Sequence, residues 1–298
     1  MALTDDIRSA CAGVAARSRH VRVVDEAIEP YAATLVAASP PAPDVEGATL
    51  EERAAFSLAL NAINFGSGWF PTLRKAPGMS GFRTVEAGLR AHGPWTAGAL
   101  AAVAREEIAD AVGQDPAHEL IGHFAVHLQE LGERVRDEHG GSFLALARSG
   151  DGSATRLMER LASWPTWRDV SVYEGEPVPF YKRAQIAAAD LALTGIAPAS
   201  DLAELTLFAD NLVPHVLRID GVLEFDDELA SRIAAERLIE HDSPEEVEIR
   251  ACALHAVELL VAAHGSTTAT AVDNVLWHRG GEPRYKAIPR HRARTTDY

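Results

Sequence analysis

The sequence predicts a mainly α-helical protein, with one compact domain over residues 1–298 and at most a small β-hairpin. Three observations lead to this expectation: amphipathic helical patterns recur along most of the chain, the clearest alternating segment is short, and no linker divides the chain cleanly. Hydrophobic residues make up 47% of the sequence, an ordinary value for a globular protein. Such a domain leaves room for two helical lobes and for a peripheral position of the N-terminal ~15 residues.

Three segments in the first half of the chain carry helical patterns. Residues 49–62 open with a capping box, in which Thr49 is followed by Glu52. Residues 97–112 are rich in alanine with a helical apolar stripe, and we expect a single helix there. Residues 118–136 have one apolar face, formed at helical spacing by Leu120, Phe124, Leu128 and Leu131.

The clearest helix is predicted over residues 244–264. Ser243 caps it, Pro244 takes the first position and Glu246 completes a capping box. Gly265 ends it. The stripe expected to be buried consists of Val247, Ala251, Leu254, Val257 and Val261.

Two segments do not have a helical pattern. Residues 64–83 carry several glycines and prolines with aromatic residues between them, so they cannot form one regular helix. Residues 169–180 alternate like a strand or a hairpin around Glu174 and Gly175. A small β element is therefore expected there.

Residues 194–219 contain a pattern similar to the helix-hairpin-helix module of DNA glycosylases, in which a carboxylate follows the hairpin. A Gly-Ile-Ala-Pro turn precedes a predicted helix that Ser200 or Asp201 would cap and that ends at Asp210. Pro214 breaks the pattern, and a second short helix follows. The dipole near a helix C-terminus disfavours an anion, which favours a functional role for Asp210. Alternatively, Asp210 caps the second helix.

The composition limits the classes of partner. The net charge of −15 disfavours binding to a nucleic-acid duplex, because such binding depends on clustered Lys and Arg. A small anionic ligand needs only a local cation and stays possible. Cys11 and Cys252 cannot form a disulfide framework, and the sequence shows neither a signal peptide nor an apolar stretch long enough to span a membrane. We therefore expect a cytoplasmic protein, whose oligomeric state the sequence does not indicate.

A run of histidines resembles a metal site only superficially. His118, His123 and His127 follow the pattern H-E-x-x-x-H-x-x-x-H, whereas zincins need H-E-x-x-H, and Gly122 occupies the second ligand position. We expect an ordinary helix surface and no metal.

Two further groups are candidates for ligand binding. Lys182 and Arg183 follow two aromatic residues at the start of a helical run that reaches Leu193, and cations there favour a bound anion such as phosphate. They could equally be a solvated pair. Aromatic residues in the glycine-rich loop, Phe65 and Trp69, either stack on a flat base or fill the core under the loop.

Several long segments, taken in order, resemble one family, the queuosine salvage proteins (queuosine 5'-phosphate N-glycosidases). The similarity extends from about residue 50 to the C-terminus. It includes NAINFGSGWF at 61–70, GGSFLALARS at 140–149, WRDVSVYEGEPVPFYKRAQIAAAD at 167–190, LTLFAD at 205–210, EVEIRACALHAVEL at 246–259 and AIPRHRARTTDY at 287–298. The family fold is a helical relative of the helix-hairpin-helix glycosylases.

The resemblance implies hydrolysis of the N-glycosidic bond of queuosine 5'-monophosphate, which frees queuine for tRNA modification without a metal or a cofactor. Asp210 would stabilise the oxocarbenium-like sugar or align water. Lys182 is the first candidate for the phosphate, and Arg183 either assists it or forms a structural ion pair. The remaining substrate-binding candidates are Phe65 and Trp69 as stacking partners, Asn64 for a base edge, Tyr181, and His215 as a donor.

Three alternatives remain open. The segment 211–215 departs from the family pattern, in which an aromatic residue and a cation follow the aspartate, so the enzyme could act on another modified 7-deazapurine nucleotide or nucleoside. A protein that binds such a nucleotide without cleaving it is the second alternative. A DNA-repair glycosylase is the third, and the acidic composition disfavours it. The basic run from Arg284 to Arg294 is expected to pack near the pocket and not to trail as a tail.

Overall fold

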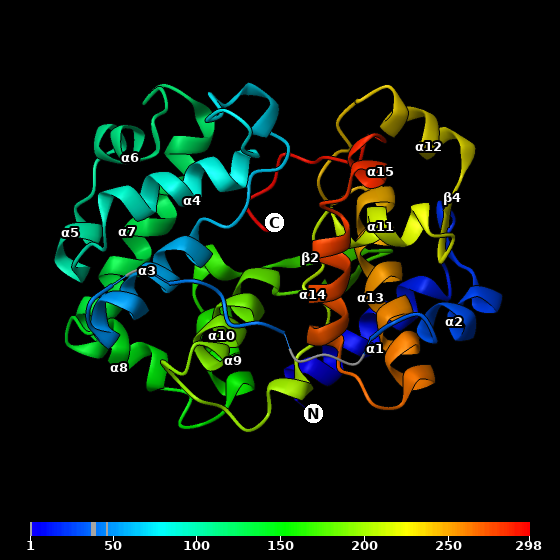
Figure 1. Ribbon diagram of the computed structural model, residues 1–298, viewed down its shortest axis with the longest axis horizontal. Coiled ribbons are helices and arrows are strands. Elements are labelled where there is room, and N and C mark those ends of the chain that lie inside the picture. Colours follow the sequence, from blue (N-terminus) through cyan, green and yellow to red (C-terminus); the bar gives the residue numbers. More distant parts are fainter. Residues whose placement is uncertain (1, 37–39, 46) are drawn as a thin grey trace.

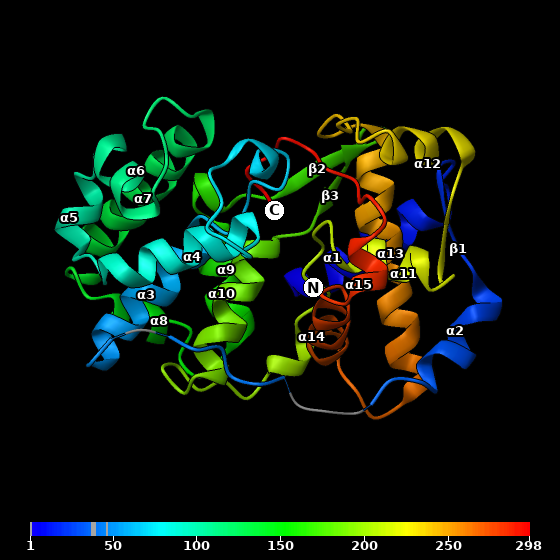
Figure 2. The same cartoon turned by 45° about the horizontal axis from the view of Figure 1, so that its top comes forward.

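The computed structural model describes residues 2–36, 40–45 and 47–298 (Figure 1). Over these ranges the chain forms 15 α-helices and two small antiparallel strand pairs, so the predicted mainly helical fold class is confirmed. Figures 1 and 2 show the elements gathered into two lobes, with the last residues of the chain between them. None of the described helices combines the length and the apolar character needed to cross a membrane.

The first lobe is formed by the middle of the chain around one apolar core. Its α-helices are α3 (Leu50–Ala62), α4 (Gly81–His92), α5 (Ala97–Ala101), α6 (Arg105–Val112), α7 (Glu119–His139), α8 (Phe143–Arg148), α9 (Ala154–Ala162) and α10 (Lys182–Leu193). Single turns of 3-10 helix are η1 (Phe70–Thr72), η2 (Pro165–Trp167) and η3 (Leu202–Glu204). The predicted apolar face of α7 is confirmed, because all four of its residues are fully buried.

Local sequence signals set the start of α3. The Thr49 hydroxyl accepts from the backbone N–H of Glu52, and the Glu52 carboxylate accepts from the N–H of Thr49, which confirms the predicted capping box.

The predicted single helix over 97–112 is wrong, because α5 ends at Ala101 and α6 begins at Arg105. The side-chain amide of Gln129 on α7 donates to the carbonyl of Val103 at 2.8 Å. This tertiary bond satisfies a backbone group that lies at the break in the helix.

The second lobe combines the two ends of the described chain around a separate apolar core. Its elements are α1 (Leu3–Ala15), β1 (Val21–Val23), α2 (Asp25–Ala32), β2 (Val170–Tyr173), β3 (Glu176–Pro179), α11 (Val213–Ile219), β4 (Leu223–Phe225), α12 (Asp227–Ala234), α13 (Pro244–His264), α14 (Ala269–Arg279) and α15 (Pro283–Lys286). The first helix, for which a peripheral position had been allowed, buries Ile7, Cys11 and Val14 in this core.

The long α13 lies at the centre of the second lobe (Figure 1). Ser243 caps it and Gly265, in the left-handed region at φ 74°, ends it, as predicted. The predicted capping box is wrong, because the carboxylate of Glu246 accepts from the N–H of Asp242 and not from that of Ser243. Glu246 is fully buried and turns toward His241.

The strands form two separate pairs. The predicted hairpin is confirmed as β2 and β3, joined by Glu174 and Gly175 with φ of 51° and 87°. The second pair joins β1 to β4, with Val21 opposite Phe225, and the sequence analysis did not predict it. Such a pairing between distant segments leaves no local turn signal.

The predicted helix after Ser200 is wrong. Only the single turn η3 forms, and residues 205–210 then run without regular structure. The amide of Gln185 on α10 explains this course, because it accepts from the N–H of Thr206 at 2.8 Å and donates to the Thr206 hydroxyl at 2.9 Å. Asp201 instead accepts from the N–H of Ala154 at the start of α9.

Candidate active site

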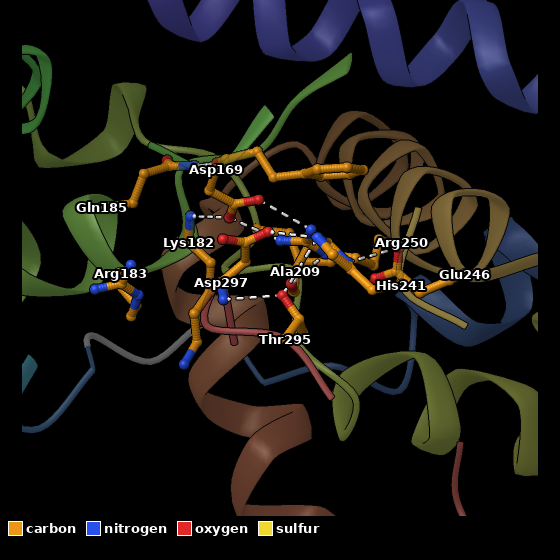
Figure 3. A network of polar contacts seen from close by, with 12 residues as sticks. Asp169, Lys182, Arg183, Gln185, Ala209, His241, Glu246, Arg250, Thr295 and Asp297 are labelled. Carbon is orange, nitrogen blue, oxygen red and sulfur yellow. Dashed lines mark hydrogen bonds and ion pairs between the residues drawn. The ribbon is translucent and has the colours of Figure 1, made fainter. Parts of the chain in front are cut away.

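A buried ion pair lies where the two lobes meet (Figure 3). Arg250 of α13 donates to the two carboxylate oxygens of Asp169 at 2.9 and 2.7 Å. Its Nε donates to the carbonyl of Ala209 at 3.1 Å, and its guanidinium lies 3.9 Å from the ring centroid of Phe180. The pair therefore fixes the backbone immediately before Asp210.

The same carboxylate of Asp169 holds the start of α10. Its Oδ2 accepts from the backbone N–H of Lys182 at 2.9 Å, next to Tyr181, which adopts the left-handed conformation (φ 49°, ψ 41°). The sequence left two alternatives for Lys182 and Arg183, a bound phosphate or a solvated pair. The solvated pair is wrong, because both side chains are buried. The Asp169 carboxylate lies at this helix N-terminus, and phosphate binding by Lys182 stays a prediction.

Asp210 is anchored through one oxygen. Its Oδ1 accepts from the N–H groups of Leu212 at 2.7 Å and Val213 at 3.2 Å, and so holds the turn that leads into α11. The N-cap residue of α11 is Leu212, without a side-chain cap, so the alternative prediction that Asp210 caps this helix is wrong by two positions. Among the described residues, no donor binds its Oδ2. One carboxylate oxygen of Asp210 is thus oriented by the backbone while the other stays available.

The ammonium group of Lys182 interacts electrostatically with the carboxylate of Asp210. It is buried and donates to the backbone carbonyl of Asn64 at 2.8 Å, which joins α10 to the glycine-rich loop. Burial lowers the pKa of Lys182 to about 8, although the carboxylates of Asp210 and Asp273 act in the opposite direction. The lysine is therefore mostly charged at neutral pH.

Two acidic residues that the sequence analysis missed interact with the same ammonium group. Asp273 on α14 is buried, and burial together with Asp210 raises its pKa well above the ordinary value. Burial also raises the pKa of Asp190 on α10 to about 6, while a hydrogen bond from Asn61 at 2.8 Å opposes the shift. Both residues stand inside helices without any local motif, so only the tertiary fold reveals them.

The end of the chain packs against the segment after Asp210. We call residues 285–298 the C-terminal strap. The amide of Asn211 donates to the carbonyl of His291 at 3.1 Å, and Nε2 of His215 donates to that of Tyr285 at 2.9 Å. The expectation that the basic C-terminal run packs against the protein and does not trail as a tail is thereby confirmed, and its position near a substrate pocket stays a prediction.

The strap also touches the first lobe. Gly66 donates its N–H to the carbonyl of Tyr298 at 3.1 Å, and the backbone of Gly68 lies against Ala293. At the second lobe, Asp297 lies 3.2 Å from Nε2 of His241. Burial opposes the charged imidazolium, but Asp297 and Glu246 together raise the pKa of His241 to about 10.

The aromatic candidates lie in the core of the first lobe. Phe65 is 2% exposed and packs edge-on against Phe124 at a centroid distance of 5.3 Å. Trp69 is 4% exposed, and its Nε1 donates to Glu119 at 2.7 Å. These contacts favour the alternative in which both rings fill the core under the loop. Their role in stacking on a base stays a prediction.

Arg183 and His215 are also buried. Arg183 donates to the carbonyls of Ala62 at 2.9 Å and of Thr166, which connects α3 to η2. Burial lowers the pKa of Arg183 to about 10. His215 binds Tyr285 through Nε2, while its buried Nδ1 has no hydrogen-bond partner in the described structure. Burial lowers the pKa of His215, so its ring is neutral at neutral pH.

The three histidines at α7 have separate surroundings. Nδ1 of His118 accepts from the N–H of Leu120, as an N-cap. His123 contacts the ring of Trp69, with centroids 5.2 Å apart. His127 is buried with Nδ1 at 3.3 Å from Arg183, and burial together with this cation lowers its pKa to about 2. A positive guanidinium at that distance disfavours a metal ion at His127.

A carboxylate anchored through one oxygen, whose other oxygen has no donor in the described ranges, can stabilise a positive charge that develops next to it, such as that of an oxocarbenium-like sugar. Comparison with known sequences identifies the family. The chain belongs to the queuosine salvage protein family, whose sequence profile matches residues 48–298.

Three curated relatives named queuosine 5'-phosphate N-glycosylase/hydrolase illustrate the similarity. The protein of Sphaerobacter thermophilus is 37% identical over 208 residues, which cover 67% of this chain and 64% of that protein. The Mus musculus protein is 32% identical over 57% of this chain and 56% of its own length. The Schizosaccharomyces pombe protein is 33% identical over 50% of this chain and 45% of its own length. The chain thus matches less than two thirds of each relative.

Proposed function

We propose that this protein hydrolyses the N-glycosidic bond of queuosine 5'-phosphate and releases queuine for reuse in tRNA modification, in the cytoplasm. Its family and the names of its relatives support this substrate. The structural observation that supports the reaction is the arrangement of Asp210. Its Oδ1 accepts from two backbone N–H groups, while Oδ2 has no donor within the described ranges.

The reaction breaks the bond between ribose C1' and the base nitrogen and forms a bond from C1' to a water oxygen. The sugar passes through an oxocarbenium-like state, and the negative charge of Asp210 stabilises it or orients the attacking water. No metal is needed for this step.

The departing base takes up a proton, and the protein holds a candidate acid. Burial, together with the charge of Asp210, raises the pKa of Asp273 well above its ordinary value and so favours the protonated form of this carboxyl. In this proposal Asp273 acts as the acid and Asp210 stays charged, the division of roles that two neighbouring carboxyl groups often adopt.

The substrate is a free nucleotide and not a nucleic acid. A net charge of −15 supports this choice, because duplex binding requires an extended basic surface. A gel-shift experiment at low salt would contradict it if the protein retarded duplex DNA.

A turnover assay without added metal tests the function. The protein is mixed with queuosine 5'-monophosphate, and free queuine is followed by liquid chromatography for the wild type, Asp210→Asn and Lys182→Ala. We expect release by the wild type, loss in Asp210→Asn and a raised KM in Lys182→Ala. Binding without release would point to a nucleotide-binding protein. If neither occurs, a panel of other 7-deazapurine nucleotides and nucleosides tests the alternative substrates.

A further inference from the structure

One cation near Asp210 lacks the partner that its neighbours have. Four arginines lie between residues 284 and 294, and three of them form ion pairs with the body of the molecule: Arg284 with Asp220, Arg292 with Glu236, and Arg294 with Glu119. For Arg290, the described residues supply no carboxylate within ion-pair distance and no hydrogen-bond acceptor. The residue is nevertheless only partly exposed.

The backbone around Arg290 is fixed from both sides. His215 binds the carbonyl of Tyr285, and Asn211 binds the carbonyl of His291, so the strap is tied to α11 on either side of Arg290. Asn211 directly follows Asp210 in the sequence. The positive charge of Arg290 is accordingly attracted by the carboxylate of Asp210. The strap thus holds a guanidinium that has no ion-pair partner among the described residues, close enough to Asp210 to interact with it electrostatically.

The charges around Asp210 are unevenly distributed. Lys182 interacts with the carboxylates of Asp210, Asp273 and Asp169. Among the carboxylates of the described ranges, Arg290 interacts with Asp210 alone, and it also feels the positive charge of Arg292.

His215 lies near the same positive charges, because both Arg290 and Arg218 act on its ring and help to lower its pKa. At Lys182 a phosphate dianion is therefore repelled by the charges of Asp210 and Asp169, whereas at Arg290 the charge of Arg292 adds to the attraction and Asp210 is the carboxylate that opposes it.

We propose that Arg290 binds the 5'-phosphate of the substrate and thereby sets the preference for the nucleotide over the nucleoside. This inference rests on the proposed function and adds a residue that the resemblance to the family did not supply. A guanidinium donates two parallel hydrogen bonds to phosphate oxygens, which gives both affinity and orientation. With the phosphate held by the strap, Lys182 is left beside Asp210 at the sugar.

Binding of ribose 5-phosphate, measured by calorimetry, tests the inference without requiring turnover. We expect Arg290→Gln to weaken this binding at least about tenfold, because a charged hydrogen-bonded contact is lost. Arg290→Lys should recover part of the affinity. The matched control is Arg284→Gln, which removes an exposed arginine whose partner Asp220 keeps other donors, and it should bind like the wild type. Equal binding by wild type and Arg290→Gln, or no binding by the wild type, would overturn the inference.

The turnover measurement separates this inference from the proposed function. The ratio of kcat/KM for queuosine 5'-monophosphate to that for queuosine should fall at least about tenfold in Arg290→Gln. An equal loss on both substrates would show that Arg290 acts only through Asp210 or the fold, and would contradict phosphate binding. If the wild type cleaves neither substrate, the proposed function fails, while the calorimetric result still decides whether Arg290 binds phosphate.

Discussion

At the scale of single residues, burial and neighbouring charge determine which groups around Asp210 carry a proton. Lys182 is surrounded by Asp210, Asp273 and Asp169, with Arg183 as an opposing charge, and its pKa is lowered to about 8. Asp190 has a pKa of about 6 in the same surroundings. Two groups thus titrate on either side of neutral pH, although the ordinary pKa values of Lys and Asp lie far from it.

The lowered pKa of Lys182 predicts that the activity depends on pH in a measurable range. A lowered pKa means that Lys182 is charged below pH of about 8 and loses its charge above it, so we expect kcat/KM to fall as the pH rises through that value. Lys182→Arg should move this fall to higher pH, because a guanidinium keeps its charge. The measurement is a pH profile of both proteins, and an unchanged profile in Lys182→Arg would exclude Lys182 as the titrating group.

Asp210 combines a structural and a chemical role, and two substitutions separate them. Asp210→Asn keeps an oxygen that accepts from the N–H groups of Leu212 and Val213, so the free energy of unfolding should change little. Asp210→Ala removes this acceptor from the turn before α11 and should cost about 1–3 kcal/mol. Both should lower kcat by about 10²–10⁴-fold. Urea denaturation and the turnover assay measure the two effects, and an active Asp210→Asn would refute the chemical role.

The sequence indicated part of this group of residues. Asp210 and Lys182 stood out through their positions at expected helix ends, and the structure brings their side chains together. No local pattern pointed to Asp273, Asp190 or Arg290. A carboxylate inside a helix and an arginine in a basic run are usually solvent-exposed, and only the complete fold shows that these three are partly or fully buried.

At the scale of elements, the sequence features that predicted helices correctly were local ones. Caps and apolar stripes predicted α3, α7, α10 and α13, because these features depend on residues within one or two helical turns. The errors came from side chains that reach a backbone group from another element. Gln129 binds the carbonyl of Val103 between α5 and α6, and Gln185 binds Thr206 in place of a helix. No pattern within 97–112 or 200–209 contains that information.

The contact between the glycine-rich loop and the C-terminal strap gives a sharp test of element packing. A Cβ atom at Gly68 would overlap the carbonyl of Ala293, so Gly68→Ala has to push the strap away. We expect a loss of about 1–3 kcal/mol in the free energy of unfolding, together with reduced turnover. The control is Gly98→Ala in α5, where nothing lies within 4 Å of the added atom and the helix should be neutral or slightly more stable. Equal stability of both variants would contradict the close approach.

At the scale of the whole molecule, the Asp169–Arg250 pair connects the lobes. Asp169 binds the N–H of Lys182 in the first lobe and the guanidinium of Arg250 in the second, and the two partners are 1% and 0% exposed. Buried pairs of this kind add little compared with apolar residues, but the loss of one partner leaves an uncompensated charge.

Removal of one partner should therefore be costly. Asp169→Ala is expected to lower the free energy of unfolding by about 3–5 kcal/mol, measured by chemical denaturation. The exposed pair of Arg22 and Glu224 serves as the control, and Glu224→Ala should cost less than about 1 kcal/mol. Similar losses of unfolding free energy in the two variants would show that burial does not increase the cost of removing one partner of the Asp169–Arg250 pair.

The sequence predicted one compact domain that left room for two helical lobes, and the structure has two apolar cores. What the sequence did not reveal is that the second lobe is assembled from segments far apart in the chain. The pairing of β1 with β4 and the packing of α1 on α13 depend on the complete fold.

This discontinuity has a consequence during synthesis. Residues 50–205 leave the ribosome as one continuous piece and can collapse around their own core while translation continues. Helix α1 is made earlier, yet the helix that covers Ile7, Cys11 and Val14 is made only after the whole first lobe. The apolar side of α1 therefore stays unpaired in the nascent chain until α13 has been synthesised. We expect newly made protein to depend on chaperones that shield such a helix, more than its stability after completion would suggest.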